Sequence, residues 1–424
     1  MHTFFAIIAI LAVALQGLSL YLALFGPDLP YDVKEGFPAS IDSTDFSSLI
    51  AALTQAQIRP GNRIEVLANG DCFYESELQA IAAARKTVNL EAYIFHRGDI
   101  SQRYIDALTE RALAGIAVKL TIDYIGSFST FRSYFRKLLE AGGRVEWYHS
   151  LRPDLWFEFN NRTHRELLII DGRVGFIGGA GIADQWYKNG VKGRRWRDTV
   201  LRVEGPAVAG LQAVFAQNWL RVSGEILTGE GNFEFPIAEQ DGVLGLVVDS
   251  TPAAGSTQAR ILFQVLIASA RKCIYINTPY FLPDRSARKA IVKAIRDRGV
   301  EVKIITPGDN SDQKLTRASS RELYGTLLKH GARIFEYGPA MIHVKALMVD
   351  DLWSVVGSTN FDYRSFDLND EVNLAIVDRN VTRRLADDFE RDLSASKQIT
   401  YEDWSTKRRF RIADRLLSFL ERQE

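Results

Sequence analysis

Two stretches of this chain carry nearly the same pattern: HRELLIIDGRVGFIGGAG at residues 164–181 and HVKALMVDDLWSVVGSTN at residues 343–360. In each, a histidine opens an apolar run, an aspartate closes it seven residues later, and a glycine-containing turn follows. Short apolar runs bounded by turn residues are typical of buried β-strands. Both stretches therefore predict a strand whose histidine lies at its beginning.

Three further pairs of segments recur in the same order on the N-terminal side of these stretches. Residues 84–95 resemble 270–281, residues 114–123 resemble 298–307, and residues 138–149 resemble 327–338. Apolar, β-branched runs alternate with amphipathic helical stretches, which predicts an α/β fold with a mostly parallel or mixed sheet. We expect two similar α/β domains related by a pseudo-twofold axis, at residues 46–230 and 231–424, with a polar, glycine-rich boundary near 222–245.

The composition of the 424 residues is that of a globular protein: 46% are hydrophobic and 25% are charged. The 52 Lys and Arg balance the 52 Asp and Glu, which disfavours wholesale electrostatic binding of nucleic acid. Two cysteines without a CxxC spacing exclude a disulfide framework and a cysteine-rich zinc module.

The N-terminus has a different character. Residues 3–27 (TFFAIIAILAVALQGLSLYLALFGP) contain no charged side chain and are long enough to cross a bilayer as a helix. We expect residues 1–27 to form a single transmembrane anchor; a cleaved signal peptide and a buried soluble helix are the alternatives. Residues 28–45 read as a linker. The flanking charges weakly favour a body outside the cytoplasm.

The second copy carries the more complete set of chemical groups. His343 and Lys345 are two residues apart, so on a strand both side chains point to one face. Ser358 and Asn360 follow on a turn that can bind phosphate oxygens. The HxKxxxxD pattern with GSxN resembles the signature of the phospholipase D superfamily, and the chain after the linker resembles bacterial cardiolipin synthases. The resemblance implies two phospholipase D-type domains, one composite site, a phospholipid partner, and neither metal nor other cofactor.

The resemblance also implies a role for each site residue. It implies phosphatidyl transfer through a phosphohistidine on His164, with His343 acting as general acid and then as base. Asp198 and Glu371 would orient the opposite or the neighbouring imidazole, and a surface ion pair is the alternative for these acids. The predicted catalytic residues are His164, His343, Lys345, Asp171, Asp350, Asp198 and Glu371; the predicted substrate-binding residues are Glu166, Gly181, Ser358 and Asn360.

Two residues of the first copy depart from the family pattern. Glu166 stands where a lysine is expected, and Gly181 stands where an amide or hydroxyl is expected. If the two copies are in register, Glu166 points into the cleft and repels the phosphate, so that Glu166→Lys would raise activity. Three explanations remain: an enzyme that works with one lysine, a relative that binds lipid without turnover, or a Glu166 that pairs with Arg162 or Arg165 and faces away.

Residues 151–161 and 186–197 combine aromatic and basic residues, as is typical of a lipid headgroup region, and ordinary core packing is the alternative for the aromatic side chains. An amphipathic helix near 406–424 is expected either at the membrane interface or docked on the body of the protein. We therefore expect a membrane-bound phosphatidyltransferase that makes cardiolipin, or a related lipid, from phosphatidylglycerol. A phospholipase D-type hydrolase of lipid or nucleic acid, and a catalytically weakened lipid-binding relative, are the alternatives. The anchor and the neutral net charge favour lipid over nucleic acid.

Overall fold

The computed structural model describes residues 31–34, 36–37, 39–149, 161–188, 195–234, 239–251 and 258–408. The expected anchor at 1–27 and the main part of the expected C-terminal amphipathic helix lie outside these residues. Within the described ranges, none of the helices combines the length and the apolar character that crossing a membrane requires.

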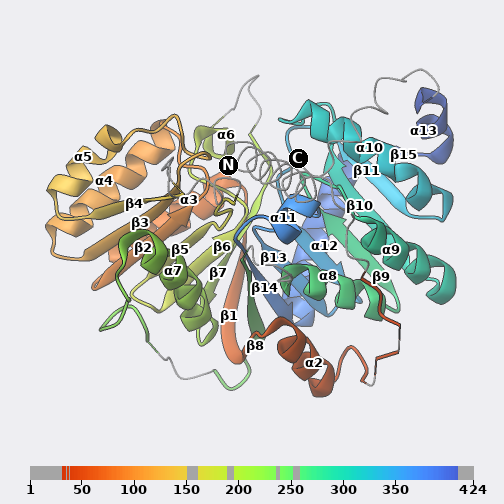
Figure 1. The fold of residues 1–424 in the computed structure, drawn as a ribbon, viewed down its shortest axis with the longest axis horizontal. Coiled ribbons are helices and arrows are strands. Elements are labelled where there is room, and N and C mark those ends of the chain that lie inside the picture. Colours follow the sequence, from red (N-terminus) through yellow and green to blue (C-terminus); the bar gives the residue numbers. More distant parts are fainter. Residues whose placement is uncertain are drawn as a thin grey trace, which may run out of the picture.

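Fifteen strands of the described chain form one mixed sheet that runs through both halves of the molecule (Figure 1). The first half contains β1 (Ile58–Ala68), β2 (Thr87–Ala92), β3 (Ala117–Asp123), β4 (Arg144–Tyr148), β5 (Leu167–Ile170), β6 (Val174–Gly178) and β7 (Thr199–Glu204). The second half contains β8 (Val243–Ser250), β9 (Cys273–Asn277), β10 (Glu301–Pro307), β11 (Arg333–Tyr337), β12 (Ala346–Val349), β13 (Trp353–Gly357), β14 (Glu371–Val377) and β15 (Ser396–Ile399).

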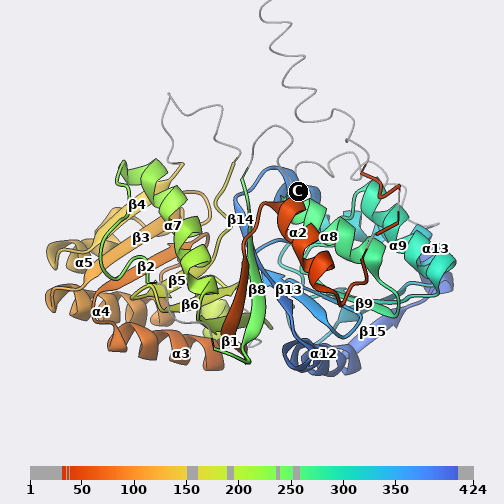
Figure 2. The ribbon, with the colours of Figure 1, turned by 90° about the horizontal axis from the view of Figure 1, so that it is seen from below.

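The two halves have the same strand order. Outward from the centre, the first half runs β1-β7-β6-β5-β2-β3-β4 and the second runs β8-β14-β13-β12-β9-β10-β11, with β15 added at the edge. In each half three strands are parallel, and the motif stretch forms an antiparallel hairpin, β5–β6 or β12–β13. The prediction of two similar α/β domains is confirmed. Antiparallel pairing of β1 with β8 joins them into one sheet (Figure 2).

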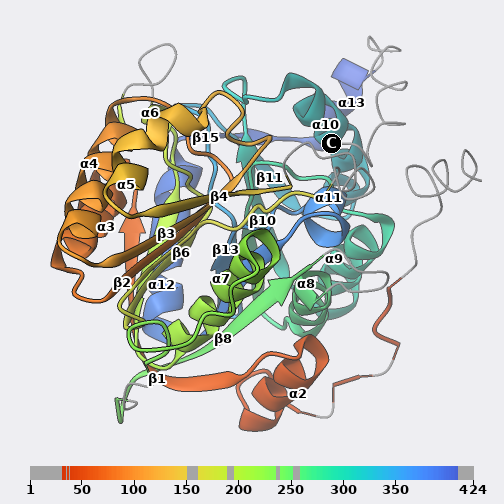
Figure 3. The ribbon, with the colours of Figure 1, turned by 60° about the vertical axis from the view of Figure 1, so that its left-hand side comes forward.

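Helices cover both faces of this sheet. They are α2 (Thr44–Thr54), α3 (Gly70–Ala83), α4 (Asp99–Leu113), the 3-10 helix η1 (Arg132–Phe135), α5 (Arg136–Glu140), α6 (Asp184–Tyr187), α7 (Ala207–Ser223), α8 (Gln258–Ser269), α9 (Arg285–Arg298), α10 (Lys314–Lys329), α11 (Tyr363–Asp367), α12 (Arg379–Ser394) and α13 (Tyr401–Arg408). Helix α7 of the first half contacts β8 of the second (Figure 3), and α12 of the second contacts β1 of the first.

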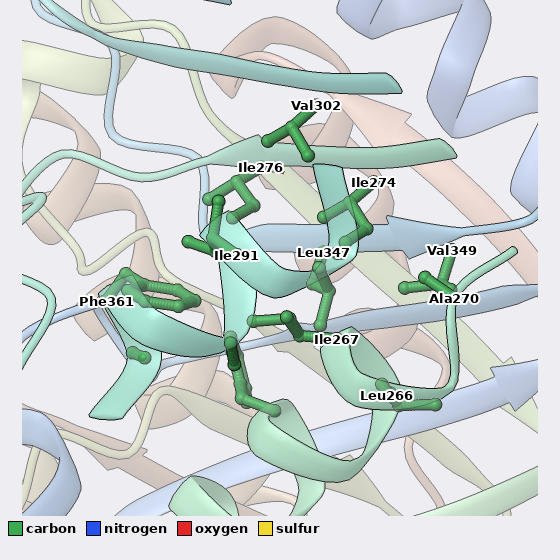
Figure 4. Close-up of a cluster of buried hydrophobic side chains, with 14 of the residues drawn as sticks. Leu266, Ile267, Ala270, Ile274, Ile276, Ile291, Val302, Leu347, Val349 and Phe361 are labelled. Carbon is green, nitrogen blue, oxygen red and sulfur yellow. The ribbon is translucent and has the colours of Figure 1, made fainter. Parts of the chain in front are cut away.

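The hydrophobic core is divided into three clusters. One lies under α3 and α4 of the first half, and a second under α8, α9 and α10 of the second half. Figure 4 shows part of the second cluster, where Leu266, Ile291 and Leu347 come from α8, α9 and β12. The third cluster combines α7, α12 and strand residues of both halves, so the domain interface is itself hydrophobic core.

The segment before β1 differs from the expected domain boundary. Phe46 and Ile50 of α2 are buried in the cluster of the second half, and the backbone carbonyl of Ile41 accepts a hydrogen bond from the indole of Trp353 at 2.8 Å. Residues 46–54 were expected to begin the first domain, but they pack on the second, because their apolar face is buried against α8.

One edge of the sheet positions the candidate site. Because β2 and β5 are antiparallel, the end of β2 lies beside the beginning of β5, and the same holds for β9 and β12. We call the edge where β2 and β9 end the site edge. The carboxyl ends of parallel strands are the usual place for active sites in α/β proteins.

Candidate active site

The two motif histidines are brought together by backbone hydrogen bonds between the domains. The amide of His164 donates to the carbonyl of Asp370 at 2.9 Å, and the amide of His343 donates to the carbonyl of Arg197 at 2.7 Å. Each contact extends an isolated parallel β-bridge between the domains. One bridge joins Thr163 to Asp370, and the other joins Ile342 to Arg197. The main chain therefore places each histidine beside the acid of the opposite domain.

Each imidazole bonds to the carboxylate that this crossing supplies. Nδ1 of His164 lies 3.0 Å from Oε1 of Glu371, and Nδ1 of His343 lies 2.9 Å from Oδ2 of Asp198. Both carboxylates are fully buried. A neutral imidazole that donates from Nδ1 keeps the lone pair on Nε2. The arrangement thus leaves Nε2 of His164 available for nucleophilic chemistry, whereas Nε2 of His343 lies 3.1 Å from Nζ of Lys345. The opposite-domain form of the prediction is the one observed.

Different groups hold the two carboxylates. The hydroxyl of Ser358 donates to Glu371 and accepts from the amide of Val372 at 3.0 Å. The indole of Trp186 donates to Oδ2 of Asp198 at 3.0 Å. Ser358 was predicted to bind substrate, but its hydroxyl is directed to the acid that orients His164. It positions Glu371.

Lys345 lies at the centre of the site. Its Nζ is 2.9 Å from Nδ1 and 3.1 Å from Nε2 of His343. A Cβ built on Gly179 would lie 2.6 Å from Cδ of Lys345 and 2.8 Å from its Nζ, so the lysine fills space that a side chain at 179 would take. Lys345 therefore reaches from its own domain to the turn of the other.

Burial dominates the electrostatics of this pair. Burial lowers the pKa of Lys345, against the opposing effects of Asp198, Glu371 and Glu166. Burial and the nearby Lys345 lower the pKa of His343, although Asp198 acts in the opposite direction. A phosphate anion bound here would favour the protonated forms of both groups.

Glu166 is bound by the backbone that follows β2. Its Oε1 accepts hydrogen bonds from the backbone amides of Tyr93 at 3.2 Å and Ile94 at 3.3 Å, directly after β2. Burial raises the pKa of Glu166 well above the usual range of a carboxyl. Glu166 also acts to raise the pKa of Lys345, so it lies within electrostatic reach of the site. Its side chain ties down the 93–94 backbone, and its place beside a bound phosphate stays a prediction.

The explanation that Glu166 pairs with Arg162 or Arg165 is wrong. Arg162 pairs with Asp123 at 3.4 Å. Arg165 is fully buried, donates to the carbonyl of Val214 at 2.9 Å, and lies 3.8 Å from a carboxylate oxygen of Asp249. Within the described chain, Glu166 forms no ion pair with either arginine.

Gly181 is coupled to Glu166 by packing. A Cβ at Gly181 would lie 2.7 Å from both Cβ and the carbonyl oxygen of Ile94, and 3.0 Å from Oε1 of Glu166. The 93–94 backbone that Glu166 holds therefore takes the space of the amide expected at 181. The corresponding Asn360 is present and buried, and its Oδ1 has no hydrogen-bond partner among the described residues, which leaves this atom available to a substrate hydroxyl.

The two motif aspartates lie in the hairpin turns. Asp171 and Asp350 adopt left-handed conformations, with φ of 53° and 55°. The carboxylate of Asp171 accepts the backbone amides of residues 85–87 at 2.7 to 2.9 Å, and that of Asp350 accepts those of residues 271–273 at 2.7 to 3.1 Å. Both lie at the far end of a strand from the histidine. The structure gives these aspartates a structural role and not the predicted catalytic one. Their hydrogen bonds hold the β5–β6 hairpin to the start of β2 and the β12–β13 hairpin to the start of β9.

Aromatic rings that the motifs did not predict surround the histidines. The ring centroid of Tyr93 lies 5.1 Å from that of His164, and the rings of Trp186 and Trp196 lie 5.2 and 5.3 Å from that of His343. The repeat offers a signal for such residues, since Tyr93 and Tyr280 both follow the first parallel strand of their half. Among the residues described, no three His, Cys, Asp or Glu side chains gather as a metal-binding group.

Comparisons with known proteins agree with this geometry. Residues 78–219 and 264–393 match the family described as cardiolipin synthase, PLD-like domain. The major cardiolipin synthase ClsA of Bacillus subtilis is 33% identical over 370 residues, which cover 86% of this chain and 76% of that protein. Cardiolipin synthase 1 of Staphylococcus epidermidis is 34% identical over 365 residues, 85% of this chain and 74% of that one.

A solved structure shares the fold. The phosphatidylserine synthase of Haemophilus influenzae superposes with a TM-score of 0.68 at 15% identity, covering 89% of this chain and 100% of that one. Both halves of the chain match the same family, and each half supplies a histidine that binds a carboxylate of the other. The chain belongs to the phospholipase D superfamily and, within it, to the cardiolipin synthase-like enzymes.

Proposed function

We propose that the protein is a phosphatidyltransferase that makes cardiolipin from two molecules of phosphatidylglycerol through a phosphohistidine. The observation that carries the proposal is the crossed pair of contacts, His164 with Glu371 and His343 with Asp198. It provides two imidazoles with defined tautomers facing one composite site, as a two-step transfer requires.

In the first step, Nε2 of His164 attacks the phosphorus of the donor lipid. A nitrogen–phosphorus bond forms, the phosphorus–oxygen bond to the glycerol headgroup breaks, and His343 donates its proton to the departing oxygen. Lys345 and Asn360 offer an ammonium and an amide to the phosphoryl oxygens. The negative charge of the substrate counteracts the burial that lowers the pKa of His343.

In the second step, the headgroup hydroxyl of another phosphatidylglycerol gives its proton to His343. Its oxygen forms a bond to phosphorus, and the bond from phosphorus to His164 breaks. Water in place of this hydroxyl would give phosphatidic acid, the product of a hydrolase. Since both reactions use the same groups, exclusion of water decides between them.

The membrane is part of this proposal. The uncharged run at residues 3–27 supports attachment through a single anchor, and the charges on either side of it weakly favour a catalytic body outside the cytoplasm. The anchor would confine the protein to the surface on which both lipid substrates lie.

The test separates the two histidines. Full-length protein is incubated with phosphatidylglycerol labelled at the phosphate, and both lipid products and acid-labile protein label are measured. The parent protein should form cardiolipin. His164→Ala should form neither product nor phosphoenzyme, whereas His343→Ala should retain a phosphoenzyme from a donor with a good leaving group.

Three results would contradict the proposal. Acid-labile label on the His164→Ala protein would reverse the two roles. Phosphatidic acid as the sole product would assign a hydrolase. No turnover by a folded parent protein that still binds phosphatidylglycerol would assign a lipid-binding relative.

A further inference from the structure

The loop after β3 has an inverted pattern of burial. In residues 124–131 the polar side chains of Ser127 and Thr130 are buried, while Phe128 and Phe131 are 71% and 68% exposed. Exposed apolar patches on a soluble domain mark an interaction surface or contact with a membrane. The loop therefore presents its two aromatic rings outward.

Hydrogen bonds fix this orientation. The hydroxyl of Ser127 donates to the carbonyl of Tyr93 at 2.9 Å and accepts from the amide of Phe95 at 2.8 Å. The hydroxyl of Thr130 donates to the carbonyl of Phe95 at 2.6 Å. Turning the phenylalanines inward would break all three buried hydrogen bonds, which is costly.

Basic side chains lie next to the aromatic rings. Arg97, Arg136 and Lys137 line a cavity of about 200 Å³ together with Phe131, and no carboxylate is among its described lining residues. Arg132 is also exposed. Arg136 lies 3.9 Å from Glu140 on the open surface, and the other three cations have no ion pair within the described part of the chain. The cavity is suited to an anionic group.

This loop lies at the site edge. Tyr93, whose carbonyl binds Ser127, packs its ring against His164. On the other half, the described chain begins at Tyr31, whose amide donates to the hydroxyl of Ser286 in the first turn of α9. Because α9 follows β9, the uncharged run at 3–27 precedes a residue that also lies at the site edge.

We propose that this edge of the first domain is a contact site for an anionic phospholipid surface, with Phe128 and Phe131 entering the membrane and Arg97, Arg136 and Lys137 binding a lipid phosphate. Aromatic rings and cations are the residue types that favour the headgroup region. The inference rests on the proposed function only in that both place the protein on phospholipid. It adds a second lipid site, outside the catalytic residues.

The first experiment measures contact directly. Full-length protein carrying Cys72→Ser receives one cysteine at Phe128→Cys, Phe131→Cys or Leu113→Cys, is labelled with a polarity-sensitive fluorophore, and is reconstituted into vesicles of phosphatidylglycerol and phosphatidylcholine. Cys72 is exposed, whereas Cys273 is buried. Leu113 is the matched control, because it is 74% exposed but ends α4 away from the site edge.

Labels at 128 and 131 should shift to the blue and be quenched by lipids with a nitroxide on the acyl chain, whereas the label at 113 should do neither. Equal behaviour at all three positions would overturn the inference. A blue shift at 128 without lipid quenching would indicate contact with a second copy of this chain, and would overturn it as well.

The second experiment tests the basic cavity. The triple variant Arg97→Gln, Arg136→Gln, Lys137→Gln is compared with Arg383→Gln, Lys329→Gln, Lys397→Gln, which changes the net charge equally at exposed sites of the second domain. Quenching at 128 should depend on phosphatidylglycerol content in the control, and this dependence should be lost in the first triple variant. Retention of the dependence would remove the cavity from the proposal.

Discussion

At residue 166 a carboxylate replaces the expected lysine, and its neighbours show why the exchange is tolerated. Glu166 caps the amides of Tyr93 and Ile94, and Ile94 lies against Gly181. The two departures from the family pattern are thus one packing arrangement. Lys345, beside Gly179, is left as the lysine of the composite site.

Changing Glu166 to lysine should lower transfer activity rather than raise it. An ammonium would face two backbone amides that need an acceptor, and the Tyr93 ring would lose its position against His164. We expect a loss on the order of tenfold, equivalent to about 1.4 kcal/mol in the transition state. Glu166→Gln keeps an acceptor oxygen and should stay near the parent rate. Melting temperatures of both variants check folding, and a gain of activity in Glu166→Lys would show that position 166 faces the phosphate.

The residues of the site differ in how far the sequence could predict them. His164 and His343 follow from the repeated motif, although they lie just before β5 and β12, so the alternation of a strand does not place them. The sequence could not show which histidine each acid binds. That pairing depends on the β-bridges between the two domains, which join segments far apart in the chain. Trp186 was expected in a lipid-facing segment, yet its indole holds Asp198. Nothing in its local sequence indicates that contact.

At the scale of elements, the two motif hairpins are tied to the sheet by their closing aspartates. Asp350 accepts three backbone amides at the start of β9, and Asp171 does the same at β2. The repeat predicted the first strand of each hairpin, but that strand begins three residues after the histidine, at Leu167 and at Ala346. It also made the aspartates look catalytic, because a carboxylate that caps backbone amides and one that takes part in chemistry are the same residue type in a motif.

Asp350→Ala should therefore reduce stability and leave the chemistry of the folded fraction intact. Leaving buried amides unpaired costs roughly 1–3 kcal/mol. Asp350→Asn retains one acceptor and tolerates the left-handed backbone, so it should lose less. Thermal unfolding and activity per folded molecule are the measurements. A stable but inactive Asp350→Asn protein would return this residue to the catalytic set.

At the scale of the whole molecule, buried carboxyls at the domain interface make stability depend on pH. Burial raises the pKa of Glu91 to about 7, although it binds Thr163 and Asn218 beside Arg165. Between the ordinary pKa of a glutamate and this value, the folded protein holds a proton that the unfolded chain has released. Stability contributed by this group is therefore highest at low pH and falls as the pH rises.

The expected slope for one such group is a loss of up to about 1.4 kcal/mol per pH unit between roughly pH 5 and 7. Glu91→Gln should flatten the profile, because its amide can satisfy the same neighbours without titrating. Chemical unfolding of the full-length protein at several pH values provides the comparison. The assignment would be contradicted if the free energy of unfolding of the parent protein rose with pH over this interval and the rise were absent from Glu91→Gln.

The pairing of β1 with β8 limits how the two halves can move relative to each other. Many two-domain enzymes open and close about a flexible connection. Here β1 pairs with β8 through an antiparallel ladder with one irregularity between Arg59 and Asn62, and α7 and α12 each pack across the junction. Opening the two halves about a hinge would expose the hydrophobic cluster that they share and would break the hydrogen bonds between β1 and β8. The separation of His164 and His343, which this junction sets, should therefore stay nearly constant whatever the site binds. The composite site is a fixed frame rather than one that domain closure assembles.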